Sequence, residues 1–388
     1  MPLPPSLCRS LLLAVLLVGA CRSRSTVPAA PVASVPDAAA SAVPVGRFSR
    51  IDVHMHIGPT SIRRALAVMD RWGIDGGVNL SGQHPGLPHH ALEAQLAAAA
   101  ESRGRIAVFA NADFELVMRR PKDYGQAMAN DLALSQRLGA IGLKIPKGLG
   151  LGYPGPDGKR LLPVDDPGLD PLFEKAGELG LPVAMHVGDP KAFWRPPTPD
   201  NERYDEMHAH PGWVFYEKDV PSWDELYAAF ERRVARHPKT TFIGVHFGND
   251  PEDPARVGAM LDQHPNLFID TAARVPEIGR QPPEKMRQFF EKYQDRILFG
   301  TDLGVGETQA EMMYGSTGSE PPTAADEARF FTQSYRYFET DGRDLESPTP
   351  IQGRWRIQGI ALPERVLQKL YYDNAAKLLR WRPPTAKR

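Results

Sequence analysis

From about residue 48 onward, short apolar runs alternate with longer amphipathic stretches. The apolar runs are rich in Ile, Val, Leu and Phe and are bounded by turn-forming residues, which is typical of buried strands. Eight segments fit this description: residues 51–54, 77–80, 106–110, 140–145, 183–186, 241–246, 267–270 and 297–300. Nine segments have helical periodicity: residues 61–72, 89–103, 123–138, 169–180, 223–237, 254–264, 284–294, 325–339 and 363–380. Alternation of this kind predicts parallel strands that are each followed by a helix.

The number of these units predicts an α/β fold, a parallel (β/α)₈ TIM barrel, which takes about 250 residues. An open doubly wound sheet would give the same alternation, but no glycine-rich phosphate-binding turn follows the first run. We therefore expect the closed barrel, with long loops at its carboxyl-terminal face. Residues 187–222 and 303–324 are such loops, whereas residues 341–360 have no predicted place.

A separate apolar pattern occupies the N-terminus. Residues 10–20 (SLLLAVLLVGA) are shorter than the roughly 20 residues that span a bilayer, and their length suits the core of a signal peptide. The run ends in VGAC, which resembles a bacterial lipobox and implies two acyl chains on Cys21. We expect an exported, membrane-anchored lipoprotein on the outer membrane or the periplasmic face. An ordinary signal peptide with a coincidental cysteine is the alternative.

These patterns divide the chain into a lipoprotein signal peptide (1–20), an Ala/Pro/Ser-rich tether (21–47) and the barrel domain (48–388). Cys8 and Cys21 are the only cysteines, so the barrel domain contains no disulfide and no thiol chemistry. The net charge is −1 and no basic stripe occurs, which argues against nucleic acid as a partner. We expect a small-molecule substrate, and the sequence leaves the oligomeric state open.

Ligand-type side chains gather at the ends of the predicted strands, where barrel enzymes carry their catalytic residues. His54 and His56 end the first strand, and because side chains alternate along a strand, both point to the same face. Four further strand ends carry a polar residue of this type: Lys144, His186, His246 and Asp302. Imidazole and carboxylate groups brought together in this way bind divalent cations.

A His-x-His pair alone is a weak signal for a metal site. The chain holds a second pair, His208 and His210, in a loop without strand character. Each strand-end residue taken alone is better explained as a hydrogen-bonded core or capping group. The prediction of a metal site depends on the whole set falling at one edge of the barrel.

The spread of these residues resembles the amidohydrolase superfamily, and in particular its second amidohydrolase-related family. That family includes sugar-lactone hydrolases and the aminocarboxymuconate-semialdehyde decarboxylase group. The motifs that carry the resemblance are IDVHMH, GLKI, MHVGD, HFGND and FGTD, and they extend it over roughly residues 48–380. The motifs are specific for the superfamily but do not identify a substrate.

The resemblance implies four ligands of a divalent cation, most often zinc: His54, His56, His186 and Asp302. A bound cation of this kind lowers the pKa of water towards neutrality. Asp302 would take the proton from the water and pass it to the leaving group. His246 would polarise the substrate carbonyl or stabilise an oxyanion.

Lys144 leaves the number of metal ions open. In binuclear relatives a lysine at this position is carboxylated and bridges two metals, and His246 then becomes a ligand of the second. The family that this chain resembles most uses one metal with an unmodified lysine, so we expect one ion, with two as the alternative.

Three further residues are candidates for substrate binding. Arg274 could pair with a substrate carboxylate in bidentate fashion, and Asn249 and Trp194 also follow strands at the expected face. A role in holding the loops is equally compatible with each. The sequence therefore predicts a metal-dependent hydrolase of a small ester, lactone or amide. A non-oxidative decarboxylase is the alternative, and a non-catalytic surface binding protein is a remote one.

Overall fold

The computed structural model describes residues 47–82 and 91–384. Cys21, the predicted signal peptide, nearly all of the tether and the predicted start of the second helix lie outside the described residues, so the lipid anchor stays a prediction. Within the described ranges, none of the helices combines the length and the apolar character needed to cross a bilayer.

Two sheets of parallel strands form the centre of the described part. The first has the order β11-β10-β1-β2-β3, and the second has the order β4-β5-β6-β7-β8-β9. The strands are β1 (Ile51–Ile57), β2 (Gly76–Asn79), β3 (Ile106–Val108), β4 (Ala110–Asn111), β5 (Leu143–Ile145), β6 (Val183–Met185), β7 (Phe242–Gly244), β8 (Leu267–Asp270), β9 (Ile297–Leu298), β10 (Leu303–Val305) and β11 (Met313–Tyr314). Only β11 runs antiparallel to its neighbour among these pairings.

Backbone hydrogen bonds join the two sheets at both seams. At one seam, the single residue Phe109 separates β3 from β4, and the Ile141 amide donates to the Val108 carbonyl at 2.9 Å. At the other seam, the Val53 amide donates to the Phe299 carbonyl at 2.9 Å, which ties β1 to the segment after β9. The strands therefore close into a (β/α)₈ barrel, and the predicted fold is confirmed.

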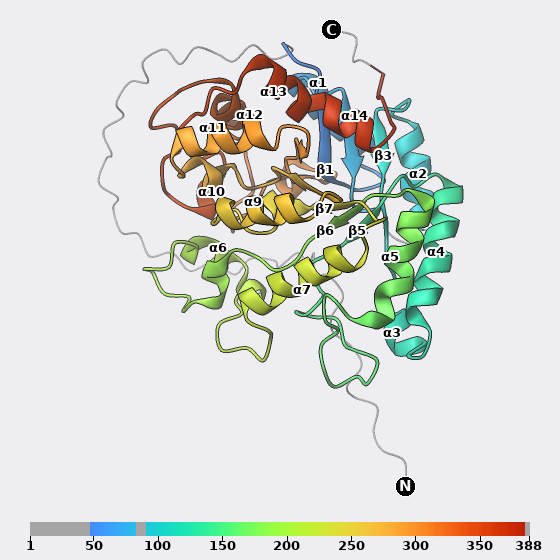
Figure 1. Ribbon diagram of the computed structural model, residues 1–388. Coiled ribbons are helices and arrows are strands. Elements are labelled where there is room, and N and C mark those ends of the chain that lie inside the picture. Colours follow the sequence, from blue (N-terminus) through green and yellow to red (C-terminus); the bar gives the residue numbers. More distant parts are fainter. Residues whose placement is uncertain (1–46, 83–90, 385–388) are drawn as a thin grey trace, which may run out of the picture. The chain divides into compact units, whose positions relative to one another are not determined.

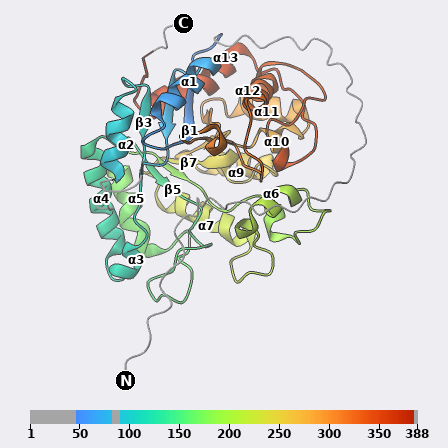
Figure 2. The same cartoon turned by 180° about the vertical axis from the view of Figure 1, so that it is seen from behind.

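The helices lie outside the strands in both views (Figures 1 and 2). The long ones that follow successive strands are α1 (Ile62–Trp72), α2 (Ala91–Ala100), α4 (Tyr124–Leu138), α5 (Asp170–Leu179), α7 (Trp223–Arg236), α9 (Pro254–Gln263), α11 (Pro283–Lys292) and α12 (Ala324–Glu339). The predicted last helix is divided into α13 (Glu364–Gln368), a π-helical turn (Lys369–Asp373) and α14 (Asn374–Leu378). All nine predicted helical segments therefore contain helix.

Local sequence explains where several helices begin and end. Helix α7 starts at a capping box, in which the Ser222 hydroxyl accepts from the Glu225 amide and the Glu225 carboxylate accepts from the Ser222 amide. Helix α1 stops at Gly73, which takes a left-handed conformation that glycine adopts without strain. The stop at Gly73 leaves a short connection to β2, which begins at Gly76.

The structure adds elements that the sequence pattern did not predict. The loop 187–222 contains α6 (Tyr204–Ala209), and α10 (Val275–Gly279) follows β8. The short helix α3 (Leu116–Arg119) lies in a predicted loop, and α8 (Val245–Gly248) is a turn at the end of β7 in which His246 and Phe247 have left-handed conformations. Each has at most six residues, too few to show a helical period in the sequence. Residues 341–360 are tied by an isolated bridge between Leu345 and Ile357.

Candidate metal centre

Strand β1 and the segment after β9 bring three metal-type donors together. The Oδ1 atom of Asp302 lies 3.4 Å from Nε2 of His54 and 3.3 Å from Nε2 of His56. All three residues have donor atoms within 4.8 Å of one another. Donors of a tetrahedral zinc ion, each about 2.0–2.1 Å from the metal, are about 3.3 Å apart. The spacing of this group therefore fits one small divalent cation.

The other ring nitrogen of each β1 histidine is held by a neighbouring side chain. Nδ1 of His54 lies 2.8 Å from Oδ2 of Asp270, and Nδ1 of His56 lies 2.7 Å from the Ser81 hydroxyl. A metal-binding histidine usually donates its second N–H to such a partner, which fixes the ring and the tautomer. These supporting roles of Asp270 and Ser81 are not apparent from the sequence, although Asp270 ends a predicted strand.

The buried environment of His54 favours the neutral imidazole, which is the form that binds a metal ion. Its ring is fully buried, and Nε2 has no hydrogen-bond partner among the described residues. Burial lowers the pKa of His54 well below its ordinary value, so the imidazole is neutral at pH 7. A buried lone pair without a partner is costly, and a cation at this position would satisfy it.

Asp302 is the anionic member of the group. Burial raises the pKa of its carboxyl, but the net direction is well below the usual range, with the hydrogen bond to the His56 ring among the opposing contacts. The Asp302 amide also donates to the His54 carbonyl at 2.8 Å, and the residue has φ = 66°. This left-handed backbone turns the chain after β9 and places the carboxylate beside β1.

His246 and His186 continue the cluster along the barrel mouth. The His246 ring lies 4.9 Å from the His54 ring and 4.3 Å from the His186 ring, between centroids. His186 does not fall within the compact three-residue donor group among the described residues. His186 is therefore adjacent to the predicted centre, and its ring contacts the His246 ring, which in turn contacts the His54 ring.

The hydrogen bonds of His246 restrict what its ring can do. Nδ1 lies 2.9 Å from the carbonyl oxygen of Ala272, which only accepts, so Nδ1 carries the proton. Burial lowers the pKa of His246 well below its ordinary value, so Nε2 holds a lone pair. This form suits a metal ligand or a proton acceptor. Polarising a substrate carbonyl, the role expected from the resemblance, would require the protonated ring.

Lys144 is buried in the same region, with 3% of its surface exposed. Its Nζ has no hydrogen-bond partner among the described residues. Burial lowers the pKa of Lys144 to about 8, although the charges of Asp302 and Asp270 oppose this shift. An amine in this state is suited either to carboxylation or to pairing with an anion that enters the site.

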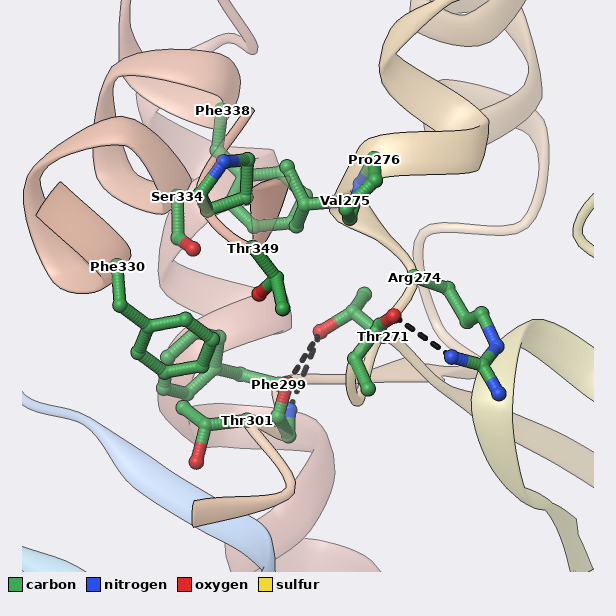
Figure 3. A pocket seen from close by; sticks show the side chains of 13 residues that line it. Thr271, Arg274, Val275, Pro276, Phe299, Thr301, Phe330, Ser334, Phe338 and Thr349 are labelled. Atoms are coloured by element: carbon green, nitrogen blue, oxygen red, sulfur yellow. Dashed lines mark hydrogen bonds between the residues drawn. The ribbon is translucent and has the colours of Figure 1, made fainter. Parts of the chain in front are cut away.

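Arg274 is a second buried cation without an acidic partner. Its guanidinium donates to the Ala273 carbonyl at 2.9 Å, and the described residues place no carboxylate within ion-pair distance of it. Figure 3 shows the side chain turned away from a small cavity lined by Phe330 and Phe338. That cavity of about 10 Å³ has room for about one water molecule, so it is too small for a substrate.

Asn249 and Trp194 use their polar groups to hold the loops. Asn249 accepts from the Val187 amide at 2.9 Å and donates to the Met185 carbonyl at 3.2 Å. The Trp194 indole donates to the Pro221 carbonyl at 3.0 Å. These contacts support the structural interpretation of both residues, and substrate contact by either stays a prediction.

A family model described as Amidohydrolase matches residues 51–381. The chain belongs to the amidohydrolase family. This confirms the membership expected from the motifs. Amidohydrolases are metal-dependent enzymes, and the His54, His56 and Asp302 group has the donors and the spacing for such a metal.

Solved structures share the fold of this amidohydrolase-family chain, whereas a search among curated proteins gave no match. A 2,6-dihydroxybenzoate decarboxylase complexed with 2,6-dihydroxybenzoate has a TM-score of 0.50 at 16% identity, covering 86% of this chain and 99% of that one. A structure of an amidohydrolase II has a TM-score of 0.50 at 14% identity, covering 85% and 99%. A Staphylococcus aureus protein assigned as an amidohydrolase gives 0.50 at 14% identity, covering 86% and 100%.

Proposed function

We propose that the protein is a metal-dependent hydrolase that cleaves a small ester, lactone or amide. The observation that carries this proposal is the three-donor group of His54, His56 and Asp302, whose spacing fits one divalent cation. Zinc suits these nitrogen and oxygen donors, and when bound it would supply Lewis acidity towards a carbonyl and a water of lowered pKa.

The protein's own residues would handle the proton. Asp302 is ionised and lies beside the histidine donors, so it would accept a proton from the attacking water and return it to the leaving group. One oxygen of the Asp270 carboxylate would hold Nδ1 of the His54 ring. The other oxygen accepts a hydrogen bond from the backbone amide of His246. This shared carboxylate fixes the His54 ring relative to the backbone of His246.

A decarboxylase is the second candidate, because the site contains cations that lack anionic partners. Lys144 and Arg274 are both buried, and neither pairs with a carboxylate among the described residues. A substrate carboxylate would satisfy them. Decarboxylation would release CO₂ and place a proton on the carbon that carried it, without consuming water. One similar structure is a decarboxylase of 2,6-dihydroxybenzoate.

The reaction products distinguish a hydrolase from a decarboxylase. The zinc-loaded protein would be incubated with panels of lactones, esters, amides and aromatic carboxylates, and acid release and CO₂ release would be measured in parallel. Hydrolysis releases acid and consumes water, whereas decarboxylation releases CO₂. If a fully metal-loaded protein released neither product from any substrate class, both enzymatic proposals would be contradicted.

Replacing Arg274 tests whether the substrate is an anion. Arg274→Met should raise KM for a carboxylate substrate about 10- to 100-fold, because charged hydrogen bonds contribute roughly 1.5–3 kcal/mol. Neutral substrates should be nearly unaffected. Arg280→Met is the matched control, because Arg280 already pairs with Glu202 at 2.6 Å. Equal effects of the two substitutions would argue against a substrate contact by Arg274.

A further inference from the structure

Asp189 lies between a predicted metal ligand and a lysine, and presents one carboxylate oxygen to each. Its Oδ2 lies 2.8 Å from Nζ of Lys147, and its Oδ1 lies 3.7 Å from Nε2 of His186. The Asp189 side chain is 5% exposed, and the charges of Lys147 and Arg274 also act on its carboxylate. The contact with His186 is longer than a hydrogen bond and is therefore electrostatic in this geometry.

The position of this carboxylate is fixed from several sides. The Asp189 carbonyl accepts from the Trp223 indole at 2.9 Å, which ties its backbone to the first residue of α7. Lys147, which follows β5, lies over the Trp213 ring with Nζ 4.1 Å from the centroid. A cation over an aromatic face in this way is held at a defined position. Contacts with Trp223 of α7 and with Lys147 therefore hold Asp189 in place.

Contacts of Trp213 connect this group to two loops at the barrel mouth. Trp213 lies in the loop 187–222, and its ring stacks on His210 at 3.9 Å between centroids. Nε2 of His210 lies 2.7 Å from the carbonyl of Thr317, which belongs to the other long loop. A continuous set of contacts thus leads from both loops through Lys147 to Asp189.

The two nitrogens of His186 are not equivalent beside this carboxylate. In the part of the chain that the structure describes, neither ring nitrogen of His186 makes a hydrogen bond, and only Nε2 faces an acid. A histidine nitrogen beside a carboxylate carries the proton, and the other nitrogen then keeps its lone pair. This arrangement leaves Nδ1 available as a donor.

We propose that Asp189 is a positioning residue that holds His186 with Nε2–H towards its carboxylate and Nδ1 free to bind the metal. Lys147 fixes the carboxylate in turn. The inference rests on the proposed metal-dependent function, since it assigns a fourth donor position to His186, which lies outside the compact group of His54, His56 and Asp302 in this geometry. It assigns Asp189 no contact with the substrate and no part in proton transfer.

The test compares metal binding by four forms of the full-length protein: wild type, Asp189→Asn, Lys147→Met and Asp250→Asn. Asp250 provides the matched control. It is also a buried aspartate paired with a lysine, at 2.9 Å from Lys191, but the described residues place no histidine within ion-pair distance of it. Zinc affinity would be measured by competition with a chromogenic chelator. The absorption spectrum of the Co²⁺-substituted protein would report the ligand geometry.

Asp189→Asn should weaken zinc binding about 10- to 100-fold, as loss of such a partner usually does, and should change the Co²⁺ spectrum. Lys147→Met should shift both in the same direction by a smaller amount, and Asp250→Asn should match wild type. Lys147 is partly exposed, so the Lys147→Met variant is expected to fold. It decides the question if the Asp189→Asn variant does not fold.

Two different failures are distinguishable. If wild type binds zinc and the Asp189 and Lys147 variants match the Asp250 control in affinity and spectrum, this inference is overturned and the proposed function stands. If wild type itself binds neither zinc nor Co²⁺, the proposed function is contradicted and the role of Asp189 with it.

Discussion

At the scale of single residues, the centre depends on backbone conformations that residue type does not reveal. Asp302, His246 and Asn249 have φ of 66°, 55° and 64°. Non-glycine residues rarely adopt this left-handed region, and they do so mostly where the surrounding structure holds them there. Asp270 accepts from the His246 amide at 2.8 Å and so helps to hold one of them. The three residues cluster at the strand ends that form the candidate site.

Asp302→Asn separates the charge of this residue from its backbone role. Asparagine tolerates the left-handed conformation, so the free energy of unfolding should change little. Turnover of the substrate found in the product assays should fall about 10²- to 10⁴-fold, because the proton acceptor is lost. Both quantities follow from steady-state kinetics and urea denaturation. Unchanged turnover would contradict the role of Asp302 as the proton acceptor.

The sequence revealed which residue types meet at the site, but not how they are oriented. His54, His56 and Asp302 could be brought together in advance because the ends of parallel barrel strands share one edge. The proton on Nδ1 of His246 depends on the Ala272 carbonyl, which no side-chain pattern shows. The carbonyl-polarising role suggested for His246 by the sequence therefore stays a prediction.

At the scale of elements, the long periodic segments were predictable and the short ones were not. All eight strand segments and all nine helical segments have counterparts in the structure. By contrast, α6 and α10 are held by tertiary contacts more than by their own sequence. Arg203 precedes α6 and pairs with Glu206 at 2.7 Å and with Glu277 of α10, and all three side chains are buried. Arg203 and Glu277 are far apart in the chain, so their pairing leaves no local signal.

Asn249→Ala tests how the end of β6 is held. The substitution leaves the buried Val187 amide and Met185 carbonyl without their Asn249 partner and places alanine in a left-handed conformation. The free energy of unfolding should fall by on the order of 2 kcal/mol, and zinc affinity should weaken because His186 lies between these two residues. Urea denaturation and chelator competition measure the two effects. A stability equal to wild type would show that these hydrogen bonds do not hold the strand end.

At the scale of the whole barrel, closure brings together the two ends of the described domain. The Asp302 amide donates to the His54 carbonyl, so the last and the first barrel units share the metal site. The count of eight units predicted this closure. The arrangement of the loops 187–222 and 303–324 over the mouth was not predictable, because it depends on contacts such as that between His210 and Thr317.

Buried Asp250 should make the stability of the barrel depend on pH. Burial raises its pKa from 3.8 to about 6, and the ion pair with Lys191 offsets this only in part. The folded state therefore holds the proton to higher pH than the unfolded chain does, and the stability that Asp250 contributes is lost as pH rises from about 4 through about 6.

Asp250→Asn removes this dependence because asparagine imitates the protonated acid. Between about pH 4 and pH 7, wild type should lose up to about 3 kcal/mol of unfolding free energy relative to the variant. Urea denaturation of both proteins at several pH values gives the difference directly. Parallel pH profiles for the two proteins would contradict the raised pKa of Asp250.

The metal content of the purified full-length protein tests the central claim most directly. Elemental mass spectrometry would compare wild type, never exposed to chelator, with the double variant His54→Ala/His56→Ala. About one zinc or similar ion per chain in wild type, and none in the variant, is the predicted result. About two ions would make Lys144 a bridging group and His246 a ligand. A wild-type protein without metal would contradict the assignment of this site as a metal centre.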